Sequence, residues 1–176
     1  MIILIGGASH TGKTLLAQQL LEKYRFPYLS IDHLKMGLIR SGQTDLTPTD
    51  DEALTTYLWP IVREMIKTAI ENSQNLIVEG CYIPFDWADS FSPEYLAHIR
   101  CCFLIMSKAY IERQYQDIIR HRRVIEDRLP DEGPSMEDLI RENIYNFRQC
   151  RENGCPYILL EDRYHIDLDR IVCDSH

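Results

Sequence analysis

Residues 6–14, GGASHTGKT, have types and spacing that suit the binding of a phosphate chain. Gly7, Gly12, Lys13 and Thr14 match the pattern G-x-x-x-x-G-K-[ST]. Glycines let a backbone curl around an anion, so that successive N–H groups point at its oxygens. The Lys13 ammonium can neutralise the β- and γ-phosphates, and the Thr14 hydroxyl can bind Mg²⁺. The predicted nucleotide-binding residues are Gly7, Ala8, Ser9, His10, Thr11, Gly12, Lys13 and Thr14.

The alternative is a strand-to-helix turn that is merely rich in glycine. At ordinary residue frequencies the pattern arises by chance in under roughly one chain in a hundred of this length. Here the apolar residues 1–5, MIILI, precede it, and residues 13–24 continue with a helical pattern of apolar side chains. This context favours a loop that holds a nucleoside triphosphate.

An acidic residue follows the second apolar run, in the sequence IDHLK at 31–35. In an open α/β sheet, ligands bind at the carboxyl ends of the strands, so Asp32 is expected near the phosphate loop. Its carboxylate could accept the proton of an attacking hydroxyl, which makes Asp32 the candidate general base. Alternatively, Asp32 caps a helix over residues 33–40; capping and catalysis can coexist.

Short apolar runs alternate with helical patterns along the chain, which predicts an α/β fold with a mainly parallel sheet. The five predicted strands are 1–5, 27–31, 75–79, 101–106 and 156–160. Beyond residues 13–24, the predicted helices begin at Thr49, with capping-box spacing to Glu52 and a kink or break at Pro60, at Ser107 and at Ser135. A length of 176 residues without repeats indicates a single domain, 1–176.

Composition excludes several classes of protein. The formal net charge of −8 argues against a nucleic-acid partner, and no apolar run approaches a membrane span. The six cysteines form no CxxC pair and read as reduced thiols, and the start of the chain does not resemble a secretion signal, so a cytoplasmic location is expected. Neither N-K-x-D nor D-x-x-G occurs, which leaves no guanine-reading sequence.

With these motifs, the chain resembles the P-loop small-molecule kinases of the adenylate and shikimate kinase fold group, and especially the chloramphenicol phosphotransferase, zeta toxin and polynucleotide kinase branch. GGASHTGKT and the later SIDHLK carry the resemblance. It implies a three-layer P-loop fold with helices on both faces of the sheet, and ATP and Mg²⁺ as cofactors. It also implies that Asp32 orients or deprotonates the acceptor hydroxyl, and that Glu79 reaches Mg²⁺ through water. A surface position for Glu79 is the alternative.

The resemblance further implies a small helical lid at about 120–134, between the fourth strand and the next helix. Arg120, Arg123 and Arg128 are its candidate catalytic arginines, because arginines that close over a transferring phosphoryl group stabilise its charge. The alternative is a solvated helix face in which these arginines pair with neighbouring acids.

A small-molecule acceptor is expected between residues 33–60 and 80–92. Asp32, Lys35, Arg40 and Tyr82 are the candidate substrate residues; Lys35 and Arg40 would suit an acceptor that carries phosphate or carboxylate. The expected activity is transfer of the γ-phosphate of ATP to a hydroxyl or phosphate of this acceptor. A nucleoside or nucleoside monophosphate kinase and a non-catalytic ATP-binding sensing module are the alternatives; the oligomeric state is left open.

Overall fold

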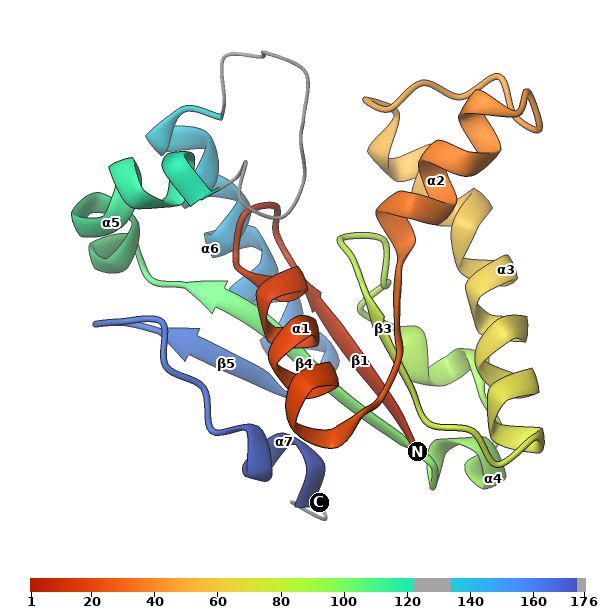
Figure 1. Cartoon of the computed structure of the whole chain (residues 1–176). Coiled ribbons are helices and arrows are strands. Elements are labelled where there is room, and N and C mark those ends of the chain that lie inside the picture. Colours follow the sequence, from red (N-terminus) through yellow and green to blue (C-terminus); the bar gives the residue numbers. More distant parts are fainter. Residues whose placement is uncertain (122–133, 174–176) are drawn as a thin grey trace.

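The computed structural model of the chain describes residues 1–121 and 134–173. Within them, five strands form one sheet in which each strand is parallel to its neighbours, in the order β2-β3-β1-β4-β5 (Figure 1). The strands are β1 (Ile2–Gly7), β2 (Tyr28–Ser30), β3 (Leu76–Glu79), β4 (Ile99–Met106) and β5 (Tyr157–Leu160). The prediction of a mainly parallel five-stranded sheet is confirmed.

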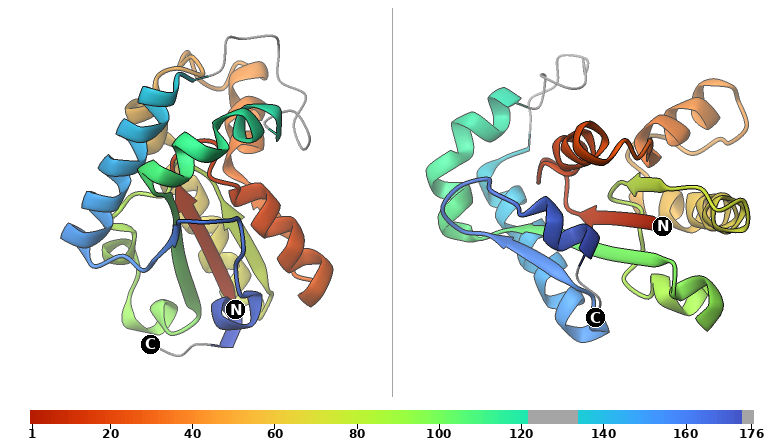
Figure 2. Two further views of the ribbon diagram at one scale, coloured as in Figure 1. Left: turned by 90° about the vertical axis from the view of Figure 1, so that its left-hand side faces the viewer. Right: turned by 60° about the horizontal axis from the view of Figure 1, so that its bottom comes forward.

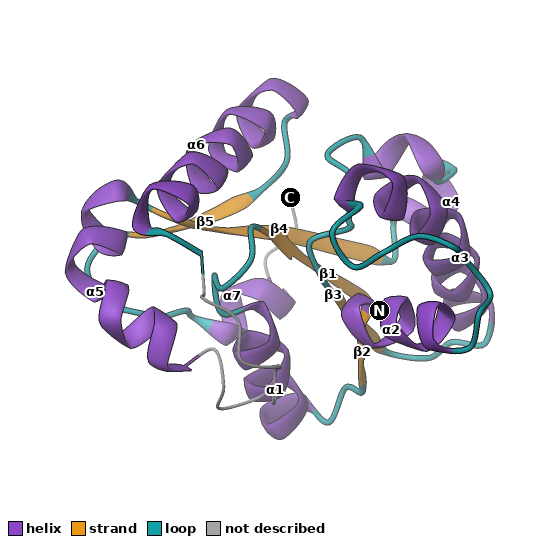
Figure 3. Cartoon of the chain, turned by 90° about the horizontal axis from the view of Figure 1, so that it is seen from above, coloured by secondary structure: helices purple, strands orange, loops and turns teal. Residues whose placement is uncertain are grey.

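Helices cover both faces of this sheet, which gives three layers. The helices are α1 (Lys13–Tyr24), α2 (Ile31–Arg40), α3 (Asp51–Glu71), a 3-10 helix (Trp87–Ser90), α4 (Pro93–Leu96), α5 (Lys108–His121), α6 (Met136–Asn153) and α7 (Leu168–Cys173). α1 and α7 lie on one face, whereas α3, α4 and α6 lie on the other (Figure 3). α5 packs beside α6 at the β5 edge (Figure 2). Within the described ranges, no helix combines the length and apolar character needed to cross a bilayer.

The central strand β1 is buried on both faces, as its uninterrupted apolar sequence predicts. Successive side chains of a strand point to opposite faces, so Ile2 and Leu4 join the cluster that contains the core of α3. Ile3 and Ile5 pack against α1 in the second cluster. Each buried aliphatic side chain stabilises the fold by about 1.5–3 kcal/mol, so these four residues anchor the centre of the sheet.

Parallel pairing brings the carboxyl ends of all five strands to the same edge of the sheet. Residue 7 ends β1, Glu79 ends β3, and Ile31 follows β2 directly. The register pairs Ile5 with Glu79, and Glu79 with Ser30. The loops that follow these strands are therefore neighbours in space, although they are far apart in sequence.

Two of the predicted helix starts are confirmed by their capping contacts. The hydroxyl of Ser107 accepts a hydrogen bond from the backbone N–H of Tyr110 at 3.1 Å. That of Ser135 accepts one from the N–H of Asp138, also at 3.1 Å. Both hydroxyls satisfy a backbone donor that the first turn of a helix leaves without a partner.

Other predicted boundaries are wrong. α2 begins at Ile31, so Asp32 lies in its first turn and Ser30 occupies the N-cap position instead. Asp50, not Thr49, occupies the N-cap position of α3, which agrees with the stronger preference for Asp than for Thr at that position. The carboxylate of Asp50 accepts from the N–H of Thr47 at 2.7 Å, and this turn fixes where the helix starts.

The predicted break at Pro60 is also absent, because α3 continues through Pro60 from Asp51 to Glu71. Proline removes one hydrogen bond to the carbonyl four residues earlier, which here belongs to Thr56. Pro60 and Thr56 are both exposed, so water can reach that carbonyl. Tertiary packing of the apolar face of α3 against the sheet outweighs the local cost.

Asn143 joins α6 to the carboxyl end of β4. Its side chain is 1% exposed. Its Oδ1 accepts from the N–H of Met106 at 2.8 Å, and its Nδ2 donates to the carbonyl of Leu139 at 2.9 Å. A backbone donor at the end of the sheet is thus satisfied by a helix side chain, and this fixes the position of α6 relative to the loop edge.

We predict that Asn143→Ala lowers the free energy of unfolding by about 1–3 kcal/mol, because it leaves the Met106 N–H buried without an acceptor. Asn153→Ala is the matched control. Asn153 is exposed on the same helix and donates to the carbonyl of Gln149, also four residues earlier, at 2.9 Å. Its expected effect is within about 0.5 kcal/mol. Urea denaturation measures both, and equal losses would contradict the assignment.

Candidate active site

The phosphate loop connects β1 to α1 and is curled by three residues with positive φ. Gly7, His10 and Gly12 have φ values of 129°, 64° and 87°. A Cβ atom on Gly7 would lie 2.4 Å from the carbonyl oxygen of Leu104, and one on Gly12 would lie 2.5 Å from the ring of Tyr164. Both glycines are required by conformation and by space. The curl forms a concave backbone surface of the kind that binds phosphate oxygens.

Lys13 points back into this loop. Its side chain is buried, and its Nζ donates to the carbonyl of Ala8 at 2.7 Å. The hydroxyl of Thr11 donates to the same carbonyl at 3.0 Å. The ammonium is therefore held over the concave side of the loop, where the phosphates of a bound nucleotide would lie.

Glu79, at the end of β3, faces the start of α1. Its side chain is only 1% exposed, so the alternative of a surface acid is wrong. The Thr14 hydroxyl donates to Glu79 Oε1 at 3.3 Å. A hydroxyl and a carboxylate at this spacing provide the hard oxygen ligands that Mg²⁺ prefers, and Mg²⁺ keeps several of its waters. The residues present thus fit a Mg²⁺ ion held by Thr14, with Glu79 in contact through water.

On the β2 side of the loop, four polar side chains form a chain of contacts. Lys35 Nζ lies 2.7 Å from Asp32 Oδ1 and donates to the Tyr82 hydroxyl at 2.9 Å. That hydroxyl donates in turn to Asp51 Oδ1 at 3.1 Å. Burial, and next the charges of Asp32 and Asp51, raise the pKa of Tyr82, so the phenol keeps its proton and remains a donor.

These groups share one cavity with a volume of about 1330 Å³. The phosphate loop, Asp32, Lys35, Glu79 and Tyr82 all line it, so the structure brings these predicted site residues together. No sequence pattern points to several other residues of the wall, which are Asp51, Asp86, Tyr110, Glu142, Tyr145 and Tyr164. They come from five separate segments that only the folded chain assembles.

Tyr164 supports the loop from the β5 side. Its hydroxyl donates to the carbonyl of Gly12 at 2.8 Å, and its ring lies where a Cβ on Gly12 would be. Desolvation by burial raises the pKa of Tyr164, so this hydroxyl also keeps its proton. The loop therefore depends on a side chain from the segment after β5.

Arg40 does not lie at the cavity. It is the last residue of α2 and is exposed, beyond the part of the helix that forms the wall. Arg120 is also exposed, with a side-chain exposure of 73%, and its Nη1 lies 3.1 Å from Asp117 Oδ1. Arg123, Arg128 and most of the predicted lid lie outside the described residues. The catalytic role of the three arginines stays a prediction.

No protein-family model matches the chain, and neither does any curated protein. Solved structures do match over nearly its whole length. A kinase candidate from Chloroflexus aurantiacus is 21% identical, with 97% of this chain and 94% of that chain covered and a TM-score of 0.56. Deoxyadenosine kinase from M. mycoides is 14% identical, with coverages of 98% and 95% and a TM-score of 0.53.

A third structure comes from the PezAT chromosomal toxin–antitoxin system of Streptococcus pneumoniae. It is 13% identical, with 98% of this chain and 75% of that chain covered and a TM-score of 0.51. At identities this low, the likeness shows the fold. The chain has the three-layer α/β fold of P-loop kinases, as the motifs predict.

We predict that Gly12→Ala weakens ATP binding at least about tenfold. A side chain in left-handed backbone costs about 1–2 kcal/mol, and 1.4 kcal/mol corresponds to a factor of ten. The contact with Tyr164 adds to this cost. Gly37→Ala in α2 is the control, because a Cβ there meets nothing within 4 Å. Calorimetric titration with ATP measures both variants. Wild-type affinity in Gly12→Ala would show that the curled loop is not the nucleotide site.

Proposed function

We propose that the chain is one P-loop kinase domain that transfers the γ-phosphate of ATP to a hydroxyl of a small-molecule acceptor. One observation carries the proposal: the phosphate loop and the carboxylate of Asp32 line the same cavity at the carboxyl edge of the sheet. A general base has to lie within reach of both the acceptor and the donor phosphate, and this edge is where open α/β sheets bind their ligands.

The loop and its lysine hold the triphosphate in this proposal. Backbone N–H groups of the curled loop and the Lys13 ammonium bind the β- and γ-phosphate oxygens. Thr14 would hold Mg²⁺ and Glu79 would contact it through water; when bound, the ion would supply positive charge that offsets the charge of the transferring group. Arg120, Arg123 and Arg128 keep their predicted role of stabilising that group.

Asp32 acts on the acceptor. Its position in the first turn of α2 directs the carboxylate into the cavity, and the ion pair with Lys35 at 2.7 Å fixes its orientation. Asp32 accepts the proton of the acceptor hydroxyl. The acceptor oxygen bonds to the γ-phosphorus, and the bond from that phosphorus to the bridging oxygen of ADP breaks. The products are ADP and a phosphate monoester, with the proton on Asp32.

We predict that Asp32→Asn lowers acceptor-dependent turnover about 100- to 10,000-fold, the usual range for loss of a general base, while ATP still binds. Lys13→Ala is expected to lose ATP binding and turnover together. The measurement is ADP release with Mg²⁺ and a panel of nucleosides, sugars, polyols, hydroxylated antibiotics and their phosphorylated or acidic counterparts, alongside ATP titration.

Asp89→Asn is the matched control, because Asp89 is exposed in the 3-10 helix, away from the cavity. The experiment also separates the kinase from a non-catalytic sensing module. A module that only binds ATP would show tight binding with no acceptor-dependent turnover, and Asp32→Asn would change nothing. That result would contradict the proposal.

A further inference from the structure

The part of the cavity wall that faces the proposed acceptor carries few positive charges. It is formed by α2, the segment that leads into and starts α3, and residues 81–86 after β3. Among the described residues of this wall, Lys35 is the one cationic side chain. The carboxylates of the same wall are Asp32, Asp51, Glu52 and Asp86. Whether this wall can bind an anionic acceptor therefore depends first on whether Lys35 is free to contact it.

The ammonium of Lys35 already contacts two groups of the protein. Its side chain is 11% exposed, and its ammonium contacts both Asp32 and the Tyr82 hydroxyl, at 2.7 and 2.9 Å. An anionic group of the acceptor would have to compete with the carboxylate of Asp32, which is also the proposed base. Binding an anion through Lys35 would thus disturb the residue that acts on the hydroxyl.

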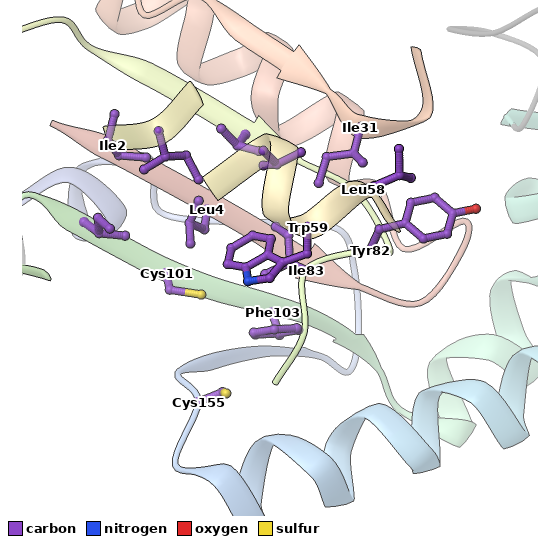
Figure 4. Close-up of a cluster of buried hydrophobic side chains, with 14 of the residues drawn as sticks. Ile2, Leu4, Ile31, Leu58, Trp59, Tyr82, Ile83, Cys101, Phe103 and Cys155 are labelled. Carbon is purple, nitrogen blue, oxygen red and sulfur yellow. The ribbon is translucent and has the colours of Figure 1, made fainter. Parts of the chain in front are cut away.

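Tyr82 makes this arrangement rigid. Its side chain is 4% exposed, and Figure 4 shows its ring near Leu58 at one end of the core cluster, with the hydroxyl pointing away from that cluster. The single phenolic proton is donated to Asp51, so the oxygen presents its lone pairs to Lys35. The direction of each hydrogen bond in the network is therefore set, and Lys35 is held on Asp32.

The opposite wall adds negative charge. Glu142 of α6 lines the same cavity. Partial desolvation, followed by repulsion from Asp51 and Asp138, raises the pKa of Glu142, and the positive charges of Lys13 and Arg141 offset part of this rise. Asp51 and Glu142 thus interact as like charges across the cavity. A phosphate or carboxylate placed between them would be repelled by both, whereas an ammonium would be attracted.

We infer that the acceptor is a hydroxyl compound without phosphate or carboxylate, either neutral or amine-bearing, and that Tyr82 is a positioning residue that holds Lys35 on Asp32. The inference rests on the proposed phosphotransferase function. It replaces the expectation that Lys35 and Arg40 bind an acidic acceptor, because Lys35 is engaged and Arg40 lies outside the cavity.

The test of the acceptor class uses matched sets in which one carbon skeleton appears as alcohol, amine, carboxylate and phosphate ester. Glucose, glucosamine, gluconate and glucose 6-phosphate form one set; glycerol, serinol, glycerate and glycerol 3-phosphate form another; adenosine and AMP form a third. ADP release by the wild-type protein is measured with each compound. We expect kcat/KM for the neutral or amine-bearing member of an accepted set to exceed that of its anionic members at least tenfold.

Preference for an anionic member would overturn the inference and leave the kinase function intact. Absence of turnover with every set, while ATP binds, would instead overturn the proposed function, and the inference with it. The two failures are therefore distinguishable. Asp51→Asn provides a second test of the charge of this wall. In this variant, the ratio of kcat/KM for the neutral or amine-bearing member to that for the phosphate ester is expected to fall several-fold. An unchanged ratio contradicts the role of this wall.

The test of Tyr82 uses Tyr82→Phe, which keeps the ring in the core and removes the hydroxyl. We expect kcat to fall about tenfold with little change in KM for ATP. We also expect the acidic limb of the pH–rate profile to move to higher pH, because Lys35 is held less firmly beside Asp32 and stabilises its ionised carboxylate less.

Tyr95→Phe is the matched control. Its hydroxyl donates to Glu71 Oε1 at 2.6 Å, and Lys67 lies over its ring, but it is far from the cavity lining. Wild-type kinetics are expected for this variant. If Tyr82→Phe lowers thermal stability and kcat without moving the pH–rate profile, the tyrosine has only a structural role and the positioning assignment is wrong.

Discussion

Parallel pairing of β1 with β3 on one side and β4 on the other is the constraint on which the site depends. Because neighbouring strands run in the same direction, each strand ends at the same edge, and each following loop contributes to one cavity. The pairing of Ile5 with Glu79 fixes how far β3 extends relative to the phosphate loop. A different register would separate the carboxylate of Glu79 from the hydroxyl of Thr14.

The charges of the site are balanced locally. Lys13 contacts a carbonyl of its own loop, Glu79 accepts a hydrogen bond from Thr14, and Asp32 pairs with Lys35. Burying an isolated charge is costly, so such contacts allow charged groups to lie inside the molecule before any ligand arrives. A bound nucleotide and its Mg²⁺ would exchange these contacts for others, and the net gain is smaller than the sum of the new interactions.

The sequence predicted the parts of the site that depend on local geometry. The phosphate loop is contiguous, and the positive φ values of Gly7 and Gly12 are a local requirement that the motif reveals. The position of Asp32 at the carboxyl edge of the sheet can be predicted because the residue follows a strand, and Asp32 lines the cavity there. Tyr164 and Asp51 could not be assigned in this way, because their roles arise from contacts with residues distant in sequence. The sequence predicts Arg40 in the site, but α2 carries it past the cavity wall, because the direction of a helix relative to a cavity depends on tertiary packing.

The hydrogen bond between Tyr164 and Gly12 has a further consequence for the order in which the molecule is completed. The two residues are 152 positions apart. During synthesis, β1 and α1 leave the ribosome well before the side chain that supports the loop between them, which follows 152 residues later. The phosphate loop of the growing chain therefore lacks one of its contacts until β5 has joined the sheet. If the loop holds a nucleotide as proposed, nascent chains that lack the segment after β5 would hold it less firmly than chains that include this segment.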